Sequence, residues 1–83
     1  MSYEKVKQAK KTIVGIKQTV KALQTGHVTE VFVALDADVR MTKCAVLLAQ
    51  NKGIPVVLVD SKRELGRACK IQVGAAVCAI TEW

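Results

Sequence analysis

The chain has 83 residues, enough for one domain, so we expect residues 1–83 to form a single unit. Apolar residues make up 51% of the chain but aromatic residues only 4%, which predicts an aliphatic core like those found where helices cover a sheet. The net charge of +6 favours a polyanionic partner. No leader is visible and no apolar run approaches the ~18–20 residues that span a bilayer, which predicts a cytoplasmic protein without a membrane partner.

Positive charge is concentrated at the start of the chain. Residues 1–21 contain six lysines and one acidic residue, whereas residues 22–39 contain three acidic residues and neither Lys nor Arg. Apolar residues at helical spacing predict a short first helix over Tyr3–Lys11 with its lysines exposed. A brief strand over Thr12–Val14 should follow it.

The next segment predicts a second helix that ends just before Gly26. Gly15 lies at its start, where unpaired backbone N–H groups carry partial positive charge and can hold a phosphate or a base-edge oxygen. Lys17 and Lys21 share its exposed face, with the amide of Gln18, a donor and acceptor, beside them. Three residues on the opposite face should dock on the core: Ile16, Val20 and Leu23. Such a helix is predicted to read RNA.

A buried strand and a third helix are predicted next. Val31–Leu35 is an uninterrupted apolar run of strand length, typical of a strand buried on both faces. Asp36 and Asp38 break this run, and an aspartate can cap the following helix. That helix should end near Asn51. Its apolar residues at core spacing are Met41, Cys44, Ala45, Leu48 and Ala49.

A second strand and a short helix follow. Pro55 opens the apolar run Val56–Val59, as proline tolerates a strand start, and we expect this strand to be buried as well. Ser61 and Glu64 have the spacing of a capping box, in which each side chain satisfies one orphan N–H of the helix start. The helix behind this box should end near Ala68.

The end of the chain predicts a loop over Lys70–Gly74 and a last strand over Ala75–Ile80. Polar and β-branched side chains alternate in this loop: Lys70, Ile71, Gln72 and Val73. An exposed apolar surface can receive an unstacked RNA base. Helices and apolar strands alternate throughout the sequence, which predicts an α/β protein, a single-domain three-layer α/β/α sandwich with a small mixed sheet.

No catalytic arrangement is apparent. His27 directly follows the helix-ending glycine and is interpreted as a turn residue, because nothing pairs with it as a triad would require. Asp36 and Asp38 follow a strand, where carboxylates can hold Mg²⁺, but no phosphate loop or third carboxylate accompanies them. We interpret both as turn and cap residues and expect no metal, no cofactor and no enzymatic activity.

The three cysteines are odd in number and lack the paired spacing of metal ligands. We expect reduced thiols without a zinc or redox role. Cys44 falls on an apolar helical stripe and Cys78 in an apolar strand, so both are predicted to be small core residues. Cys69 is nearer a loop and should be partly exposed.

Five segments follow one another in an order and spacing that resemble one protein family: Gly15–Lys21, Val33–Asp38, Gly53–Pro55, Ser61–Ala68 and Ala75–Val77. That family is the kink-turn-binding ribosomal proteins, typified by the archaeal protein that the ribosome and guide-RNA particles share. The likeness covers nearly the whole chain and is strongest to the short bacterial members found in Gram-positive species.

The resemblance implies an α/β/α sandwich that binds a kink-turn, a sharply bent internal loop of RNA with tandem sheared G·A pairs. It implies RNA contacts from the start of the second helix and from the loop before the last strand, where an extruded nucleotide would be covered. The residues concerned are Gly15, Lys17, Gln18, Lys21, Lys70, Ile71, Gln72 and Val73. An rRNA or a riboswitch would supply such a motif, and a monomer is expected.

Three positions depart from the archaeal pattern, which has Asn, Glu and Pro where this chain has Lys17, Gln18 and Val39. Gln18 can still bond a guanine edge but lacks the charge-assisted bond of a carboxylate. Lys17 donates and adds charge but cannot accept a hydrogen bond. We therefore expect affinity to depend more on phosphate contacts and to be more sensitive to salt.

Two alternatives come from other functional classes. A structural ribosome-associated subunit would dock on rRNA through its basic faces without preferring bent RNA. A small nucleotide- or metal-binding enzyme would need Asp36 and Asp38 to act, and the sequence holds no nucleophile, base or phosphate loop to support it.

Overall fold

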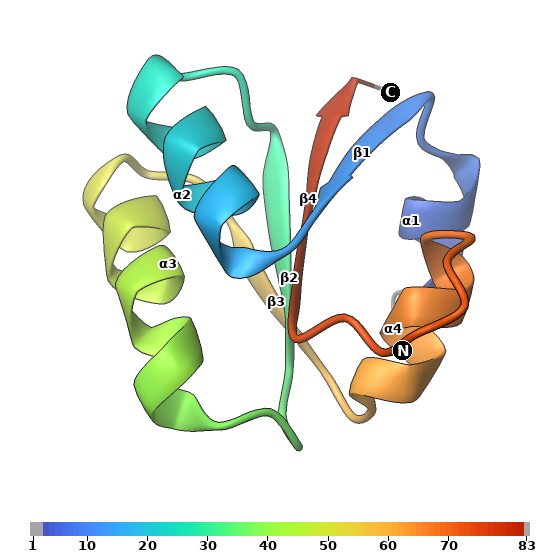
Figure 1. Cartoon of the computed structure of the whole chain (residues 1–83). Helices are drawn as coiled ribbons and strands as arrows, with labels where there is room; N and C mark the ends of the chain where they lie inside the picture. The colour runs from blue at the N-terminus through green and yellow to red at the C-terminus, as the bar shows by residue number, and fades with distance from the viewer. Residues whose placement is uncertain (1–2, 83) are drawn as a thin grey trace.

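A mixed four-stranded sheet lies between two pairs of helices (Figure 1). The computed structural model describes residues 3–82. In chain order the elements are α1 (Tyr3–Gln8), β1 (Lys11–Val14), α2 (Ile16–Thr25), β2 (Glu30–Ala34), α3 (Val39–Asn51), β3 (Val56–Val59), α4 (Lys62–Ala68) and β4 (Val77–Glu82). Helices α2 and α3 cover one face of the sheet, and α1 and α4 cover the other (Figure 1). The predicted three-layer α/β/α sandwich is confirmed.

The strand order β1-β4-β2-β3 places the C-terminal strand inside the sheet. Strand β4 runs antiparallel to both β1 and β2, whereas β2 and β3 are parallel. The register pairs Val14 with Cys78, Val33 with Val77, and Ala34 with Val59. The last residues of β1 and β2 therefore pair with the first residues of β4, and the last residue of β3 lies beside Ala34 at the same end of the sheet. We call this the lower end, after its place in Figure 1.

Each face of the sheet buries its own aliphatic cluster. All five residues of β2 are buried, and for Val31–Ala34 this confirms what the apolar run predicted. The cluster under α1 and α4 includes Phe32, Val59 and Leu65, and the cluster under α2 and α3 includes Leu23 and Val31. The core is thus held by branched aliphatic side chains and many alanines, in keeping with the composition.

Helix α3 contacts the core through part of the predicted stripe. Met41 and Cys44 are exposed, which makes their assignment to the core wrong. Ala45 and Ala49 are buried as predicted, and Leu48 is half-buried against the same cluster. Thr42, which was not predicted, is also buried, so the buried residues follow one another at spacings of three and four. Alanines let the helix approach α2 and the sheet closely, and this rotates the adjacent stripe that holds Met41 and Cys44 toward solvent.

The buried face of α2 is also rotated from the prediction. Thr19, Ala22 and Leu23 are its buried residues. The predicted core residues Ile16 and Val20 are half-buried and pack at the margin of the cluster under α2 and α3. The apolar pattern indicated the correct side of the helix, but contact with its neighbours decided which residues lie deepest.

Strand β3 is an edge strand rather than a strand buried on both faces. Only Val59 is fully buried, and Leu58 is 53% exposed. An apolar run does not reveal whether a strand has a neighbour on each side, because strand order is set by the whole sheet.

The ends of several elements differ from the predicted ones because of pairing across the chain. Helix α1 ends at Gln8, not Lys11, because the Lys10 N–H donates to the Glu82 carbonyl (2.9 Å) and Lys11 pairs with Glu82. The last strand is Val77–Glu82 instead of Ala75–Ile80 for the same reason. Leu35 lies just beyond β2 and is exposed, whereas Glu30 joins that strand.

The predicted capping box at α4 forms in only one direction. The Glu64 N–H donates to the Ser61 hydroxyl at 3.3 Å, as expected. The Ser61 N–H, however, donates to the hydroxyl of Tyr3 at 3.1 Å, and this contact ties α1 to the start of α4. The Glu64 carboxylate lies 3.7 Å from the Arg67 guanidinium instead.

Within residues 3–82, no helix combines the length and apolar character needed to cross a membrane.

Leu65→Ala should reduce the free energy of unfolding by about 2–5 kcal/mol, because this fully buried leucine of α4 would leave a cavity. Leu47→Ala is the matched control, since Leu47 is also helical but 52% exposed, and its change should stay within about 0.5 kcal/mol. Urea denaturation followed by circular dichroism would measure both. Equal losses in the two variants would contradict the burial assigned to α4.

Candidate nucleic-acid interface

The start of α2 presents backbone donors without a cap. Gly15 is the N-cap residue, with φ 108 and ψ 153, and no side chain bonds the first turn. Few L-residues adopt such a backbone conformation, so glycine is required here for the sharp entry from β1. The N–H groups of the first turn therefore remain available to an external acceptor.

Three polar side chains surround this helix start, and all three are exposed: Lys17, Gln18 and Lys21. The Gln18 Oε1 lies 2.7 Å from the position that a Cβ on Gly15 would take. The Gln18 side chain thus folds back over the glycine, and a side chain at residue 15 would displace its amide. Neither lysine belongs to an ion pair within the described part of the chain.

The segment before β4 is fastened to α4 at two backbone positions. The Ile71 N–H donates to the Gly66 carbonyl (3.1 Å), and the Ala75 N–H donates to the Lys62 carbonyl (2.9 Å). Between these bonds the Val73 carbonyl oxygen passes so close to Gly66 that an added Cβ would lie 2.1 Å from it. Gly66 is therefore a packing requirement, which lets the loop lie directly on the helix.

The predicted loop residues differ in exposure. Lys70 is exposed and has a left-handed φ of 65°, which starts the turn away from α4. Ile71 is half-buried and packs against the cluster under α1 and α4. Gln72 is exposed, and Val73 is 71% exposed. Ile71 thus anchors the loop to the core, and Val73 carries its solvent-facing apolar surface.

The helix start and the loop are neighbours at the lower end of the sheet. The Gly15 N–H donates to the carbonyl of Val77, the first residue of β4, at 3.0 Å. Just before it, the Ala76 carbonyl accepts from the Ala34 N–H at 2.9 Å. The first bond joins residues about sixty positions apart in the chain, and the second joins residues about forty positions apart. The structure therefore brings the two predicted groups of residues to one end of the sheet.

The two aspartates between β2 and α3 cap helices. Asp36 Oδ1 accepts the Lys62 N–H at 2.8 Å, which caps the start of α4 from another part of the chain. Asp38 accepts the Arg40 N–H at 2.9 Å and pairs with the Arg40 guanidinium at 3.0 Å. The Arg40 contacts hold the pKa of the Asp38 carboxyl below its usual value. Both aspartates have the structural role that the sequence predicted for them.

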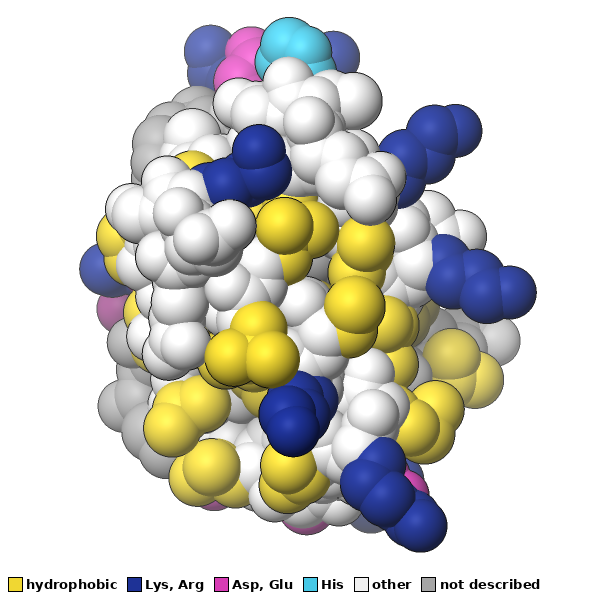
Figure 2. All heavy atoms as spheres, turned by 90° about the vertical axis from the view of Figure 1, so that its left-hand side faces the viewer, with side chains coloured by type: hydrophobic (Ala, Val, Ile, Leu, Met, Phe, Trp, Pro, Cys, Tyr) yellow, Lys and Arg dark blue, Asp and Glu magenta, His cyan; other side chains and the backbone are white. Residues whose placement is uncertain are grey.

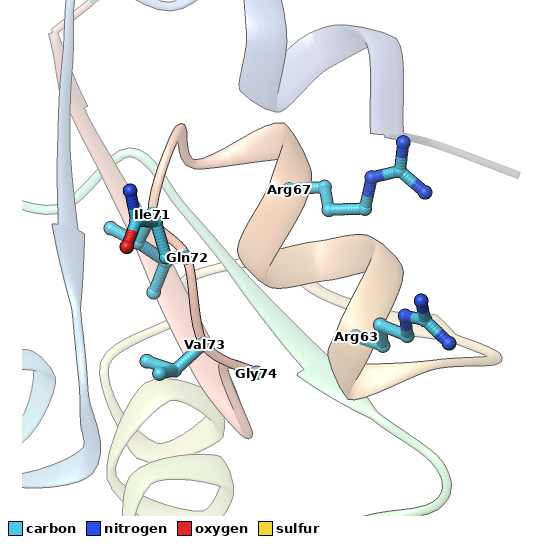
Figure 3. A pocket seen from close by; sticks show the side chains of 6 residues that line it. All are labelled: Arg63, Arg67, Ile71, Gln72, Val73 and Gly74. Carbon is cyan, nitrogen blue, oxygen red and sulfur yellow. The ribbon is translucent and has the colours of Figure 1, made fainter.

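A shallow depression borders the loop and α4 (Figure 3). Arg63 and Arg67 extend from the side of α4 that faces away from Ile71, Gln72 and Val73 (Figure 3). The side chains of the two arginines therefore do not converge on one point within the depression. The two arginines, four residues apart, form a basic strip on α4 along the depression, and sequence reasoning did not assign them to the site.

The face formed by α2 and α3 exposes many apolar side chains with lysines and arginines around them (Figure 2). Three exposed apolar residues lie just after β2 and in the first turn of α3, at the lower end: Leu35, Val39 and Met41. They lie at the same end of the sheet as the candidate site, and sequence reasoning placed Leu35 in a buried strand and Met41 in the core. In the sequence, these residues stand out only as apolar residues beside a helix cap. Buried core residues give the same pattern, so the sequence alone does not show that they are exposed.

The remaining predicted candidates lie elsewhere. His27 is exposed in the turn after Gly26, at the opposite end of α2 from Gly15. Within residues 3–82, no three His, Cys, Asp or Glu side chains gather as a metal site would need.

Comparison with known proteins identifies the family of the chain. The sequence profile of the ribosomal protein L7Ae/L30e/S12e/Gadd45 family matches residues 2–83. The chain belongs to this family. The family resemblance drawn from the five sequence segments is thereby confirmed.

Similar proteins include bacterial relatives and a solved structure from Giardia lamblia. An RNA-binding protein of Bacillus pumilus is 54% identical over 80 residues, covering 96% of this chain and 98% of the relative. An RNA-binding protein of a Geobacillus strain is 56% identical over the same length and coverage. Among solved structures, the 15.5kD RNA binding protein of Giardia lamblia superposes with a TM-score of 0.88 at 31% identity, covering 98% of this chain and 71% of the other.

Gly66→Ala should detach the loop from α4, because its Cβ would overlap the Val73 carbonyl oxygen. We expect a loss of about 1–3 kcal/mol in unfolding free energy and faster hydrogen exchange at the Ile71 and Ala75 amides. Gly26→Ala is the control, since its φ of 80° costs about 1–2 kcal/mol while its Cβ meets no atom within 4 Å. Unchanged protection of both loop amides in Gly66→Ala would contradict this attachment.

Proposed function

We propose that this protein binds RNA and recognises kink-turn motifs, stabilising the bent form of the RNA. The observation that carries the proposal is the meeting of an uncapped, lysine-flanked helix start with an exposed apolar loop at the lower end of the sheet. The first feature suits guanine edges and phosphates, and the second suits an unstacked base. A sharply bent RNA offers both kinds of group close together.

The α2 start would read the G·A step. The first-turn N–H groups and the Gln18 amide can donate to base-edge or phosphate oxygens, and Gln18 can also accept from an exocyclic amine. Lys17 and Lys21 stand on the same exposed face without an acidic partner within residues 3–82, so their charges are free to neutralise phosphates. Gly15 allows a nucleotide to approach the backbone closely.

The loop would cover the nucleotide that a tight bend pushes out of the stack. Val73 offers an apolar surface, and the exposed residues Leu35 and Val39 extend apolar surface along the same end of the sheet. The two backbone bonds to α4 hold the loop in place before binding, which lowers the entropy lost when RNA docks. Lys70 and Gln72, both exposed, can contact the sugar-phosphate chain beside that base.

The mechanism is a population shift. Kink-turn RNA exchanges between extended and bent forms, and a protein that contacts two sites only when the RNA is bent stabilises the bend by its differential affinity. No bond is made or broken, so the proposal is for a binding protein, acting as a cytoplasmic monomer without a cofactor. The names of the bacterial relatives and of the Giardia lamblia structure, all RNA-binding proteins, support the choice of ligand.

Energy transfer between fluorophores at the ends of an RNA duplex tests the proposal. The duplex carries a standard kink-turn, and its control has both G·A pairs replaced by Watson–Crick pairs. At moderate salt, the protein should bind and shorten the end-to-end distance of the first RNA only. Equal, salt-sensitive binding to both would instead support a subunit that docks on rRNA by charge. The basic strip of Arg63 and Arg67, away from the loop, is the observation that favours this second candidate.

Lys17→Ala should weaken kink-turn binding and reduce the slope of log K against log salt by about one unit, if this lysine neutralises one phosphate. Lys52→Ala removes the same charge at the far end of α3 and should leave the affinity nearly unchanged. Titrations at several salt concentrations measure both variants. An unchanged slope with weakened binding would assign Lys17 to a base contact instead of a phosphate.

Gln18→Ala should reduce discrimination between the wild-type kink-turn and the G·A-disrupted RNA by about 1–3 kcal/mol, the value of a good base-edge contact. The ratio of the two dissociation constants is the relevant readout, because it cancels general losses of affinity. A ratio equal to that of the unsubstituted protein would rule out base reading by this amide.

A further inference from the structure

The fold brings two of the three cysteines into contact. Cys69 and Cys78 are nine residues apart in the chain, and their Sγ atoms lie 2.8 Å from each other. Cys69 is the C-cap residue of α4, and Cys78 is the second residue of β4. Cys44 is exposed on α3, on the other side of the sheet. The sequence did not indicate that these two cysteines meet, because a spacing of nine residues matches no known cysteine motif. The contact forms only because β4 returns beneath α4.

The surroundings give the two thiols different properties. Cys78 is fully buried in the cluster under α1 and α4, whereas Cys69 is half-buried at the margin of that cluster. Their mutual hydrogen bond lowers the pKa of Cys69, against the opposing effect of its burial. The same bond, together with burial, raises the pKa of Cys78 far above its usual value. Cys69 is therefore the thiol that ionises first and that solvent reaches, and Cys78 keeps its proton beside it.

We propose that Cys69 and Cys78 form an oxidisable dithiol, which a hydroperoxide converts into a disulfide that joins the end of α4 to β4. The Cys69 thiolate attacks the peroxide, breaks its O–O bond and becomes a sulfenic acid, while hydroxide or an alkoxide leaves. The Cys78 sulfur then displaces water from this sulfenic acid, and its own proton goes to the departing oxygen. Two thiols lose two hydrogens, and hydrogen peroxide is reduced to two waters.

The geometry suits closure without unfolding. A disulfide bond is about 2.05 Å long, and the two sulfurs already lie 2.8 Å apart. They therefore have to move closer by less than one ångström. A thiol pair of this kind remains reduced in a reducing cytosol and forms its disulfide only transiently. The proposal keeps the expectation of reduced thiols in the resting protein and replaces the expectation that they have no redox role.

The disulfide would bracket the candidate loop. Residues 70–77 lie between the two cysteines, and Lys70, directly after Cys69, already has a strained left-handed φ. Closure pulls Cys69 toward β4 and moves the first residue of the loop. Given the proposed function, on which this consequence rests, the oxidised protein should bind kink-turn RNA at least several-fold more weakly, with recovery on addition of dithiothreitol.

The first test needs no RNA and therefore separates this proposal from the proposed function. The native protein is treated with hydrogen peroxide, alkylated, and analysed by intact mass and peptide mapping. We expect the loss of two hydrogens from the intact mass, one link between Cys69 and Cys78, and an alkylated Cys44. The same treatment in urea should lose this selectivity, because the contact is made by the fold. Oxidation of Cys44 first, or no link in the native protein, would overturn the proposal.

Variants assign the roles of the two sulfurs. Cys78→Ala removes the second thiol, so Cys69 should stop at the sulfenic acid, which dimedone traps. Cys69→Ser should slow oxidation of the remaining buried thiol strongly, and Cys44→Ser is the matched control that keeps the disulfide. Circular dichroism identifies any variant that fails to fold, and the native-against-urea comparison of the unsubstituted protein then decides. A disulfide that forms with unchanged RNA affinity would overturn the effect on the loop.

Discussion

The insertion of β4 between β1 and β2 is the constraint on which the other features of this molecule depend. The C-terminal strand pairs antiparallel with strands from the first and second quarters of the chain. Its first residue, Val77, accepts the Gly15 N–H that positions the start of α2. The same placement forces the preceding segment to cross the end of α4, which fixes the loop and brings Cys78 against Cys69. One strand thus positions the helix start, the loop and the thiol pair.

Close backbone approach makes this arrangement possible. The loop lies against α4 at a glycine, and α3 lies against its neighbours through alanines. Small residues at such contacts let backbone hydrogen bonds, rather than side chains, hold the connecting segments in place. A loop held in this way reaches a ligand with its conformation already set, which suits recognition of a rigidly bent partner better than a flexible loop would.

The fold also determines which charges remain available. Of the seven acidic residues, six are engaged in contacts within the structure: Glu30, Asp36, Asp38, Asp60, Glu64 and Glu82. These contacts cap helices, pair with nearby cations or, for Asp60, accept from the Tyr3 hydroxyl, so the acidic residues stay committed to structure. The lysines around the α2 start have no such partner in the described part of the chain. The modest net charge of the chain therefore leaves unopposed positive charge at the candidate site, where the lysines have no acidic partner among the described residues.

Local patterns in the sequence determined the elements and the candidate residues. Several signals are short-range, because each depends on neighbours within a few residues: apolar periodicity, Gly26 as a helix end, Ser61 as a cap and the apolar run Val31–Leu35. The same kind of signal marked Lys17 and Gln18 at a helix start. Their role in RNA binding stays a prediction, since the structure shows their placement and not their ligand.

Only the tertiary structure decided what depends on distant parts of the chain. Strand order made β3 an edge strand, and pairing of Lys11 with Glu82 set the limits of β1 and β4. The exposure of Cys44 and the contact between Cys69 and Cys78 were likewise beyond local inference. The periodicity of a segment indicates which side of a helix or strand a residue occupies. Whether that residue is buried, and what it contacts, depends on what packs against that side. Those neighbours come from strands that meet only when the whole sheet assembles.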